Sequence, residues 1–134
     1  MCLEIFLGSV KELPIIPWNE DNPRFYLTNL KDTQQSPLIK DVLKSNYLFK
    51  VGSHMGCACG FCITEESEDR HQRIKDVTDL LAYLSTHLPE NTLKLFCTSW
   101  EDFPNEYPEI AFSVSTPLPA EFYFEEDVVL LVTD

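Results

Sequence analysis

The feature that most constrains the fold is an apolar stripe between residues 68 and 88. Its side chains recur at spacings of three and four residues, at Ile74, Val77, Leu81, Leu84 and Leu88. This spacing places them on one face of an α-helix. A helix with one long apolar face must bury it against another element, so the segment predicts a helix packed on a sheet. Ser67 is expected to cap this helix, and Pro89 prevents it from continuing.

Several shorter segments have the alternation or the aromatic and β-branched content that is typical of strands. They are residues 2–8, 25–30, 47–51, 92–98, 110–114 and 122–133. The last segment contains an unbroken apolar run from Val128 to Val132, which indicates a strand buried on both faces. A short helix is predicted over 37–45, because Ser36 can act as its N-cap and Pro37 suits its first position.

The order of these elements predicts an α+β fold, with a mixed sheet of five to six strands and one long and one short helix packed on it. The length of 134 residues fits one domain, which we expect to span residues 1–134. The strand–loop–helix–strand section from 47 to 98 is a candidate for a parallel crossover. An acidic and aromatic loop is expected over residues 100–109.

The charge balance narrows the classes of partner. The chain has 10 basic and 22 acidic residues, a net charge of −12. Nucleic acid and anionic membrane surfaces are therefore not expected as partners, because both are bound through clustered Lys and Arg. The sequence has neither a signal peptide nor a membrane-length apolar run, so we expect a cytoplasmic protein. A protein partner or a small ligand remains open, as do enzymatic activity and the oligomeric state.

The segment GSHMGCACGFC, residues 52–62, is the main candidate for function. It holds three of the five cysteines and three of the four glycines in the chain. In a reducing compartment such cysteines are thiols, metal ligands or transient redox groups. The glycines indicate a backbone that turns unusually or approaches a neighbour closely. Loops of special shape on a rigid scaffold often carry function.

The first interpretation of this loop is a metal site with His54, Cys57, Cys59 and Cys62 as ligands. Thiolates and imidazoles are ligands of zinc, and soft thiolates also suit Cu(I). Zinc is the cofactor that this interpretation allows, and the sequence indicates no other. Structural zinc sites usually combine two separated pairs of ligands, so further ligands would have to come from outside the loop. The candidates are Cys2, Cys97, His71 and His87.

The second interpretation is a thiol enzyme or redox protein. Cys59 and Cys62 form a C-x-x-C motif between a predicted strand and a predicted helix. This context resembles thioredoxin-like redox proteins, and Thr116-Pro117 would match the cis-proline position of that family. The resemblance implies that the helix N-terminus activates the first thiol, that of Cys59. In that family the helix begins at the motif, whereas here the polar stretch 64–73 follows it.

A related interpretation makes Cys57 a lone nucleophile with His54 as its base. A third interpretation is structural, because unpaired cysteine often behaves as a small buried hydrophobe. Cys57 and Cys59 would then fill a tight turn, while Phe61 and Ile63 pack inward. The sequence as a whole predicts a non-enzymatic binding or interaction module whose loop 52–62 holds a ligand or metal. A thiol-dependent enzyme using Cys57, or Cys59 with Cys62, is the alternative.

Overall fold

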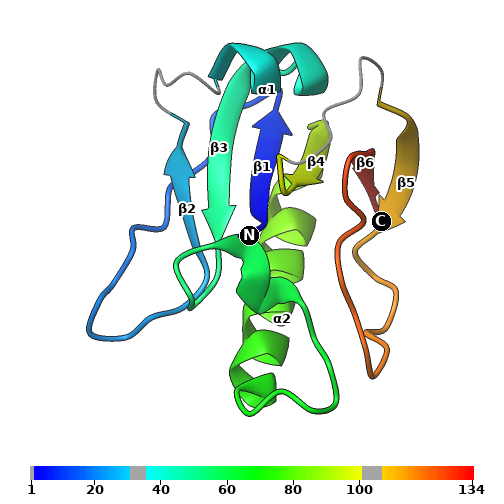
Figure 1. The fold of residues 1–134 in the computed structure, drawn as a ribbon. Coiled ribbons are helices and arrows are strands. Elements are labelled where there is room, and N and C mark those ends of the chain that lie inside the picture. Colours follow the sequence, from blue (N-terminus) through cyan, green and yellow to red (C-terminus); the bar gives the residue numbers. More distant parts are fainter. Residues whose placement is uncertain (1, 31–35, 101–106) are drawn as a thin grey trace.

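A computed structural model describes residues 2–30, 36–100 and 107–134. These residues form one mixed six-stranded sheet with two α-helices, the α+β fold that the sequence predicts (Figure 1). The elements are β1 (Glu4–Ser9), β2 (Tyr26–Asn29), α1 (Ser36–Leu43), β3 (Tyr47–Gly52), the 3₁₀ turn η1 (Ala58–Phe61), α2 (Arg70–His87), β4 (Leu93–Thr98), β5 (Glu109–Ser113) and β6 (Val129–Thr133).

The N-terminal strand β1 lies inside the sheet, whose strand order is β2-β3-β1-β4-β6-β5. It pairs antiparallel with β3 on one edge and with β4 on the other. Strands β3 and β4 are therefore parallel to each other, as the predicted crossover requires. They are not neighbours, because β1 lies between them. Strand β6 pairs antiparallel with β4 and parallel with β5, which makes the sheet mixed.

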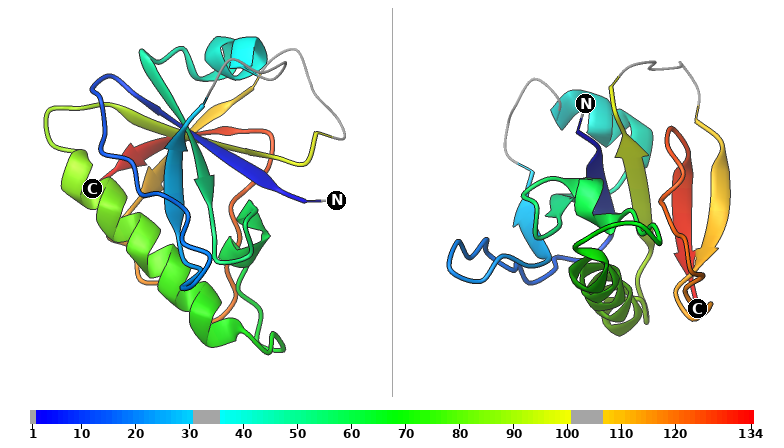
Figure 2. Two further views of the ribbon diagram at one scale, coloured as in Figure 1. Left: turned by 90° about the vertical axis from the view of Figure 1, so that its left-hand side faces the viewer. Right: turned by 60° about the horizontal axis from the view of Figure 1, so that its bottom comes forward.

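The two helices cover opposite faces of the sheet (Figure 2). Ile5 and Leu7 of β1 belong to the larger apolar cluster, together with buried residues of α2. Phe6 points to the other face and joins a smaller cluster with residues of α1. Successive side chains of a strand point to opposite faces, so this central strand is apolar on both. The same alternation buries Val129 in the smaller cluster and Leu130 in the larger.

Helix α2 begins two residues later than predicted and ends one residue earlier. Its N-cap is Asp69, with no side-chain capping bond, so the prediction that Ser67 caps it is wrong. The Asp69 carboxylate instead accepts hydrogen bonds from Arg73 and His54. The fully buried apolar positions are Val77, Leu80 and Leu84. Ile74, Leu81 and Leu88 of the predicted stripe pack only partly buried at the margin of the same core.

The end of the short helix and the start of the last strand both lie close to a residue with a left-handed backbone. Helix α1 stops at Leu43 rather than at residue 45, because Lys44 has a φ of 51°. The predicted strand 122–133 is regular only over Val129–Thr133. Asp127, with a φ of 58°, interrupts the extended backbone before it. Residues 101–106, most of the loop expected over 100–109, lie outside the described residues.

Among the described residues, no helix is both long and apolar enough to cross a membrane.

Replacing Leu84 with alanine should test the burial of the α2 face. Leu84 is fully buried, so the Leu84→Ala variant should lose about 2–5 kcal/mol of unfolding free energy, measured by urea denaturation. Leu81→Ala is the matched control on the same helix. Because Leu81 is only partly buried, its loss should be clearly smaller. Equal losses in the two variants would contradict this packing.

Candidate functional site

The loop 52–62 folds back on itself after β3. The Ser53 amide donates to the Cys57 carbonyl oxygen at 3.0 Å, and the Gly56 amide donates to the Ser53 carbonyl oxygen at 3.0 Å. Gly56 has a φ of +85°, a conformation that costs glycine little. The chain then enters η1, where Ala58 and Phe61 are buried in the larger core cluster. The inward packing predicted for Phe61 and Ile63 is confirmed, since both are about 1% exposed.

Ser53 holds the two halves of this loop together. Its side chain is fully buried, and its hydroxyl donates to the Cys57 carbonyl oxygen at 2.6 Å. The Ser53 hydroxyl oxygen in turn accepts the amide hydrogens of Gly60 at 3.1 Å and Met55 at 3.2 Å. A side chain at position 60 would collide with Ser53. The backbone carrying the cysteines is therefore fixed by hydrogen bonds within the loop itself.

Arg73 of α2 holds the backbone of η1 in place through hydrogen bonds. Its Nη1 donates to the carbonyl oxygens of Cys59 at 3.0 Å and Cys62 at 2.8 Å. Its Nε donates to Asp69 Oδ1 at 2.7 Å. This hydrogen bond from Arg73 is the largest of the effects that lower the pKa of Asp69; burial opposes it, and the hydrogen bond from His54 and the charge of Arg73 add to it. The guanidinium thus links the N-terminal turn of α2 to the backbone of η1.

His54 lies between two carboxylates. Its Nδ1 is 2.5 Å from Asp76 Oδ2, and its Nε2 is 2.9 Å from Asp69 Oδ2. Both ring nitrogens of His54 therefore face carboxylate oxygens and are occupied by these two contacts. Asp76 is fully buried and also accepts the backbone amides of His54 at 2.9 Å and Phe25 at 3.0 Å.

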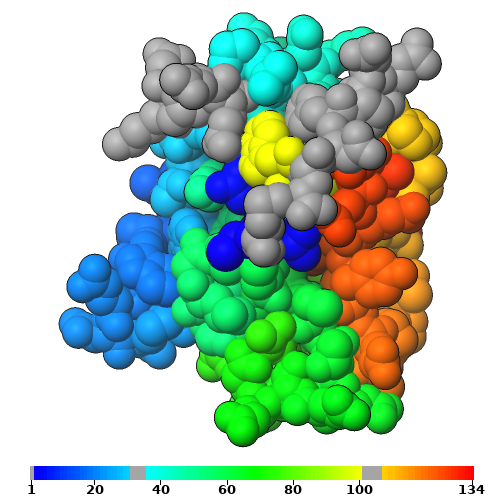
Figure 3. Space-filling model, viewed as in Figure 1, coloured from blue at the N-terminus to red at the C-terminus, as the bar shows by residue number. Residues whose placement is uncertain are grey.

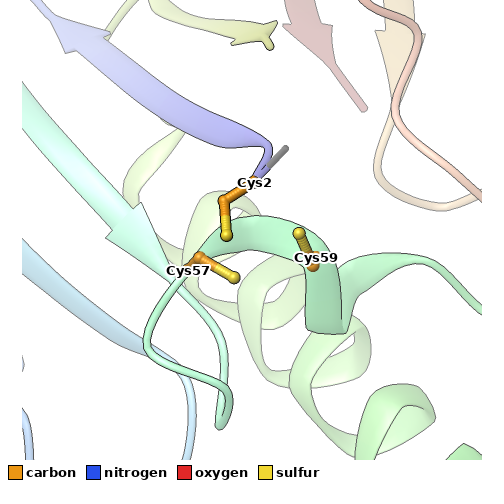
Figure 4. Close-up of side chains that lie close together, drawn as sticks. All are labelled: Cys2, Cys57 and Cys59. Carbon is orange, nitrogen blue, oxygen red and sulfur yellow. The ribbon is translucent and has the colours of Figure 1, made fainter.

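Three cysteine sulfurs meet where the N-terminal segment passes the loop (Figure 4). The Sγ atoms of Cys2, Cys57 and Cys59 all lie within 4.8 Å of one another. The backbone of Leu3 holds the N-terminal segment against the loop, because its carbonyl oxygen accepts the Ala58 amide hydrogen at 3.0 Å. The Leu3 amide also donates to Cys59 Sγ at 3.3 Å. We call Cys2, Cys57 and Cys59 the cysteine cluster.

The cysteine cluster overlaps the four ligands predicted from sequence but differs from them. Cys57 and Cys59 are in it, whereas His54 and Cys62 are not. His54 turns both ring nitrogens to carboxylates, and Cys62 follows η1 as its C-cap. Cys2, which the sequence offered only as a source of a further ligand, supplies the third sulfur. Metal binding by the predicted set stays a prediction.

Cys97 differs from the cysteine cluster in its environment. It is about 1% exposed and packs in the larger core cluster. Burial raises the pKa of its thiol to about 12. The nearby charges of Glu126, Asp127 and Cys59 act in the same direction. Cys97 therefore fills the role of a small hydrophobe.

The features expected of a thioredoxin-like site are absent from the described residues. No described peptide bond is cis, so Thr116-Pro117 does not reproduce the cis-proline. Helix α2 begins at Arg70, well after the C-x-x-C motif, so its N-terminus does not start at Cys62. His54 is held by Asp69 and Asp76, and neither ring nitrogen is free to face Cys57. A thiol enzyme stays a prediction that this geometry does not favour.

Comparisons of this chain with protein-family models, with curated proteins and with solved structures find no match.

Replacing Asp76 with alanine should strongly destabilise the fold. The change would leave the His54 ring and the backbone amides of His54 and Phe25 without this acceptor, which should cost about 3–5 kcal/mol in urea denaturation. Asp79→Ala is the control on the same helix, because it removes only a surface ion pair with Lys75. That loss should stay below about 1 kcal/mol. A comparable loss in both variants would show that Asp76 is not the anchor of the loop.

Alkylation of the native protein at about pH 8 should separate Cys97 from the cysteine cluster. The raised pKa keeps the Cys97 thiol protonated far above this pH, and its burial blocks the reagent. Iodoacetamide followed by peptide mass spectrometry should modify the exposed Cys2 readily and Cys97 only after denaturation. Modification of Cys97 at the rate of Cys2 in native protein would disprove its burial.

Proposed function

We propose that this protein is a binding module that holds one thiophilic metal ion, zinc or Cu(I), through the thiolates of Cys2, Cys57 and Cys59. The observation that carries the proposal is the meeting of three sulfurs from two distant parts of the chain within 4.8 Å. The proposal keeps the loop 52–62 as the functional element, retains Cys57 and Cys59 of the four predicted ligands, and adds Cys2 in place of His54 and Cys62.

The spacing of the sulfurs suits a common ion. A zinc–thiolate bond is about 2.3 Å long, so sulfurs that share one ion lie about 4 Å apart. The cluster, with every pair within 4.8 Å, needs only a small contraction to reach this distance. Thiolates are soft donors and select zinc, Cu(I) or iron–sulfur clusters over hard cations such as Mg²⁺ or Ca²⁺. The ligand set therefore supports a thiophilic ion.

The exposure of the three cysteines argues against a purely structural role. A free cysteine that acts as a hydrophobe is normally buried, as Cys97 is. Cys2 is exposed, and Cys57 and Cys59 are only partly buried. Their side chains gain little from packing, so apolar burial does not explain why they converge. Reactive or metal-binding cysteines typically occupy such partly exposed positions.

The support around the sulfurs also suits a metal site. Metal ligands work best when hydrogen bonds to neighbouring groups hold them in place, and losing such support typically costs 10–100-fold in affinity. Here Ser53 and Arg73 fix the carbonyl groups of Cys57 and Cys59. The net charge of −12 favours cations generally over anionic ligands. A reducing cytoplasm, the location expected from the sequence, would keep the three thiols available for metal.

Metal content should test the proposal. Protein purified without chelator and reconstituted with Zn²⁺ or, under anaerobic conditions, with Cu(I) should retain about one ion per chain after desalting, measured by mass spectrometry of the elements. Changing Cys57 or Cys59 to serine removes one of only three thiolate ligands, so each variant should retain less than about a tenth of that amount after desalting. Cys2→Ser should weaken retention in the same direction.

Cys62→Ser is the matched control, because Cys62 lies in the same loop but outside the cysteine cluster. It should retain metal as the unmodified protein does. Retention of neither ion by the unmodified protein would refute the proposal. A loss in Cys62→Ser equal to that in Cys57→Ser would instead favour the four ligands predicted from sequence.

A further inference from the structure

We propose that a zinc ion held by the cysteine cluster keeps its fourth coordination position open to a donor from outside the chain, and that this donor is a small thiol. The inference rests on the proposed function and adds the class of ligand that the site would take. It follows from the number of donors at the cluster, from the side on which they are exposed and from the preference of thiolate-bound zinc for soft ligands.

The cluster offers three donors and, within the described part of the chain, no fourth. Zinc in proteins is almost always four-coordinate, and sites with three protein ligands bind water or substrate at the remaining position. Among the described residues, no further His, Cys, Asp or Glu donor joins the three sulfurs. The two nearest alternatives in the sequence are His54 and Cys62. Nothing in the loop thus completes a closed tetrahedron.

His54 is held away from this role by strong interactions. Its two ring nitrogens are bonded to Asp69 at 2.9 Å and to the buried Asp76 at 2.5 Å. Ligation would require one ring nitrogen of His54 to leave its carboxylate. If that carboxylate were Asp76, a fully buried acceptor would lose one of its partners. The two carboxylates that hold the loop through His54 therefore also keep this side chain, the one histidine of the loop 52–62, away from the cysteine cluster.

Cys62 is fixed through its backbone. Its amide donates to the Cys59 carbonyl oxygen at 3.2 Å, and its own carbonyl oxygen accepts Arg73 at 2.8 Å. These bonds close η1 with Cys59 and Cys62 at opposite ends of one turn. The Cys62 sulfur is not among the donors that come together at the cysteine cluster. Cys97 cannot replace it without leaving the apolar core, where it is about 1% exposed.

The cysteine cluster is accessible from solvent. Cys2 is exposed, and Cys57 and Cys59 are partly exposed. The N-terminal segment and the loop lie side by side on one surface of the molecule (Figure 3). The sulfurs converge from the two sides of this contact (Figure 4). A ligand of a few atoms can therefore approach the ion from solvent, and a thiolate is the donor that matches three sulfurs in softness.

Cobalt(II) provides the spectroscopic test, because its absorption in a zinc site reports the number of thiolates bound to it. Cobalt-loaded protein should show a three-sulfur spectrum. Titration with glutathione should convert it to a four-sulfur spectrum with saturation at one thiol per ion. X-ray absorption of the zinc form should show three sulfurs at about 2.3 Å and one oxygen or nitrogen at about 2.0–2.2 Å, then four sulfurs after glutathione is added.

The controls separate this inference from the proposed function. Cys62→Ser should give the same spectra and the same response to glutathione. Four sulfurs before any thiol is added, falling to three in Cys62→Ser, would overturn the inference while leaving metal binding intact. A bound ion whose spectrum does not respond to glutathione would also overturn the inference and leave metal binding intact. Retention of Cu(I) without retention of zinc or cobalt would have the same consequence. Failure to bind any of these ions would refute the proposed function, and the inference with it.

Discussion

A buried carboxylate is the interaction on which the site depends. Asp76 lies on the core-facing side of α2 with no exposed surface, where an unpaired charge would cost several kcal/mol. The cost is met because Asp76 bonds to the His54 ring and to the backbone amides of His54 and Phe25. One side chain therefore ties the long helix to the loop after β3 and to the entrance of β2. Displacing the loop would remove the two His54 contacts of this buried carboxylate.

The position of the central strand β1 is the second constraint on the geometry of the site. Strand β1 pairs on both edges and is apolar on both faces, so its position is set by the whole sheet. Its N-terminal extension must then pass η1, where Leu3 exchanges hydrogen bonds with Ala58 and Cys59. Cys2 reaches the loop as a consequence. Two independently fixed backbones thus bring three sulfurs together, an arrangement in which a metal ion would need little reorganisation of the chain.

Much of the fold was predictable because it depends on local patterns. The alternation at Ile5 and Leu7 and the helical spacing of Val77 and Leu84 identify elements that bury one face. The element ends were less predictable, since Lys44 and Asp127 adopt a left-handed backbone that neither residue type requires. Ser67 matched the pattern of a helix cap, but the N-cap is Asp69. No local pattern shows that the Asp69 carboxylate would bond to His54 and Arg73.

The sequence by itself determined the type and order of the main elements, the α+β class and the choice of the glycine- and cysteine-rich loop as the candidate site. These follow from periodicity and composition, which act over a few residues. Only the tertiary structure decided which donors meet. It moved His54 to Asp69 and Asp76, separated Cys62 from the cluster and brought Cys2 to Cys57 and Cys59. The reason is physical: strand pairing and the satisfaction of a buried charge are long-range constraints, and the spacing of residues along one loop does not contain them.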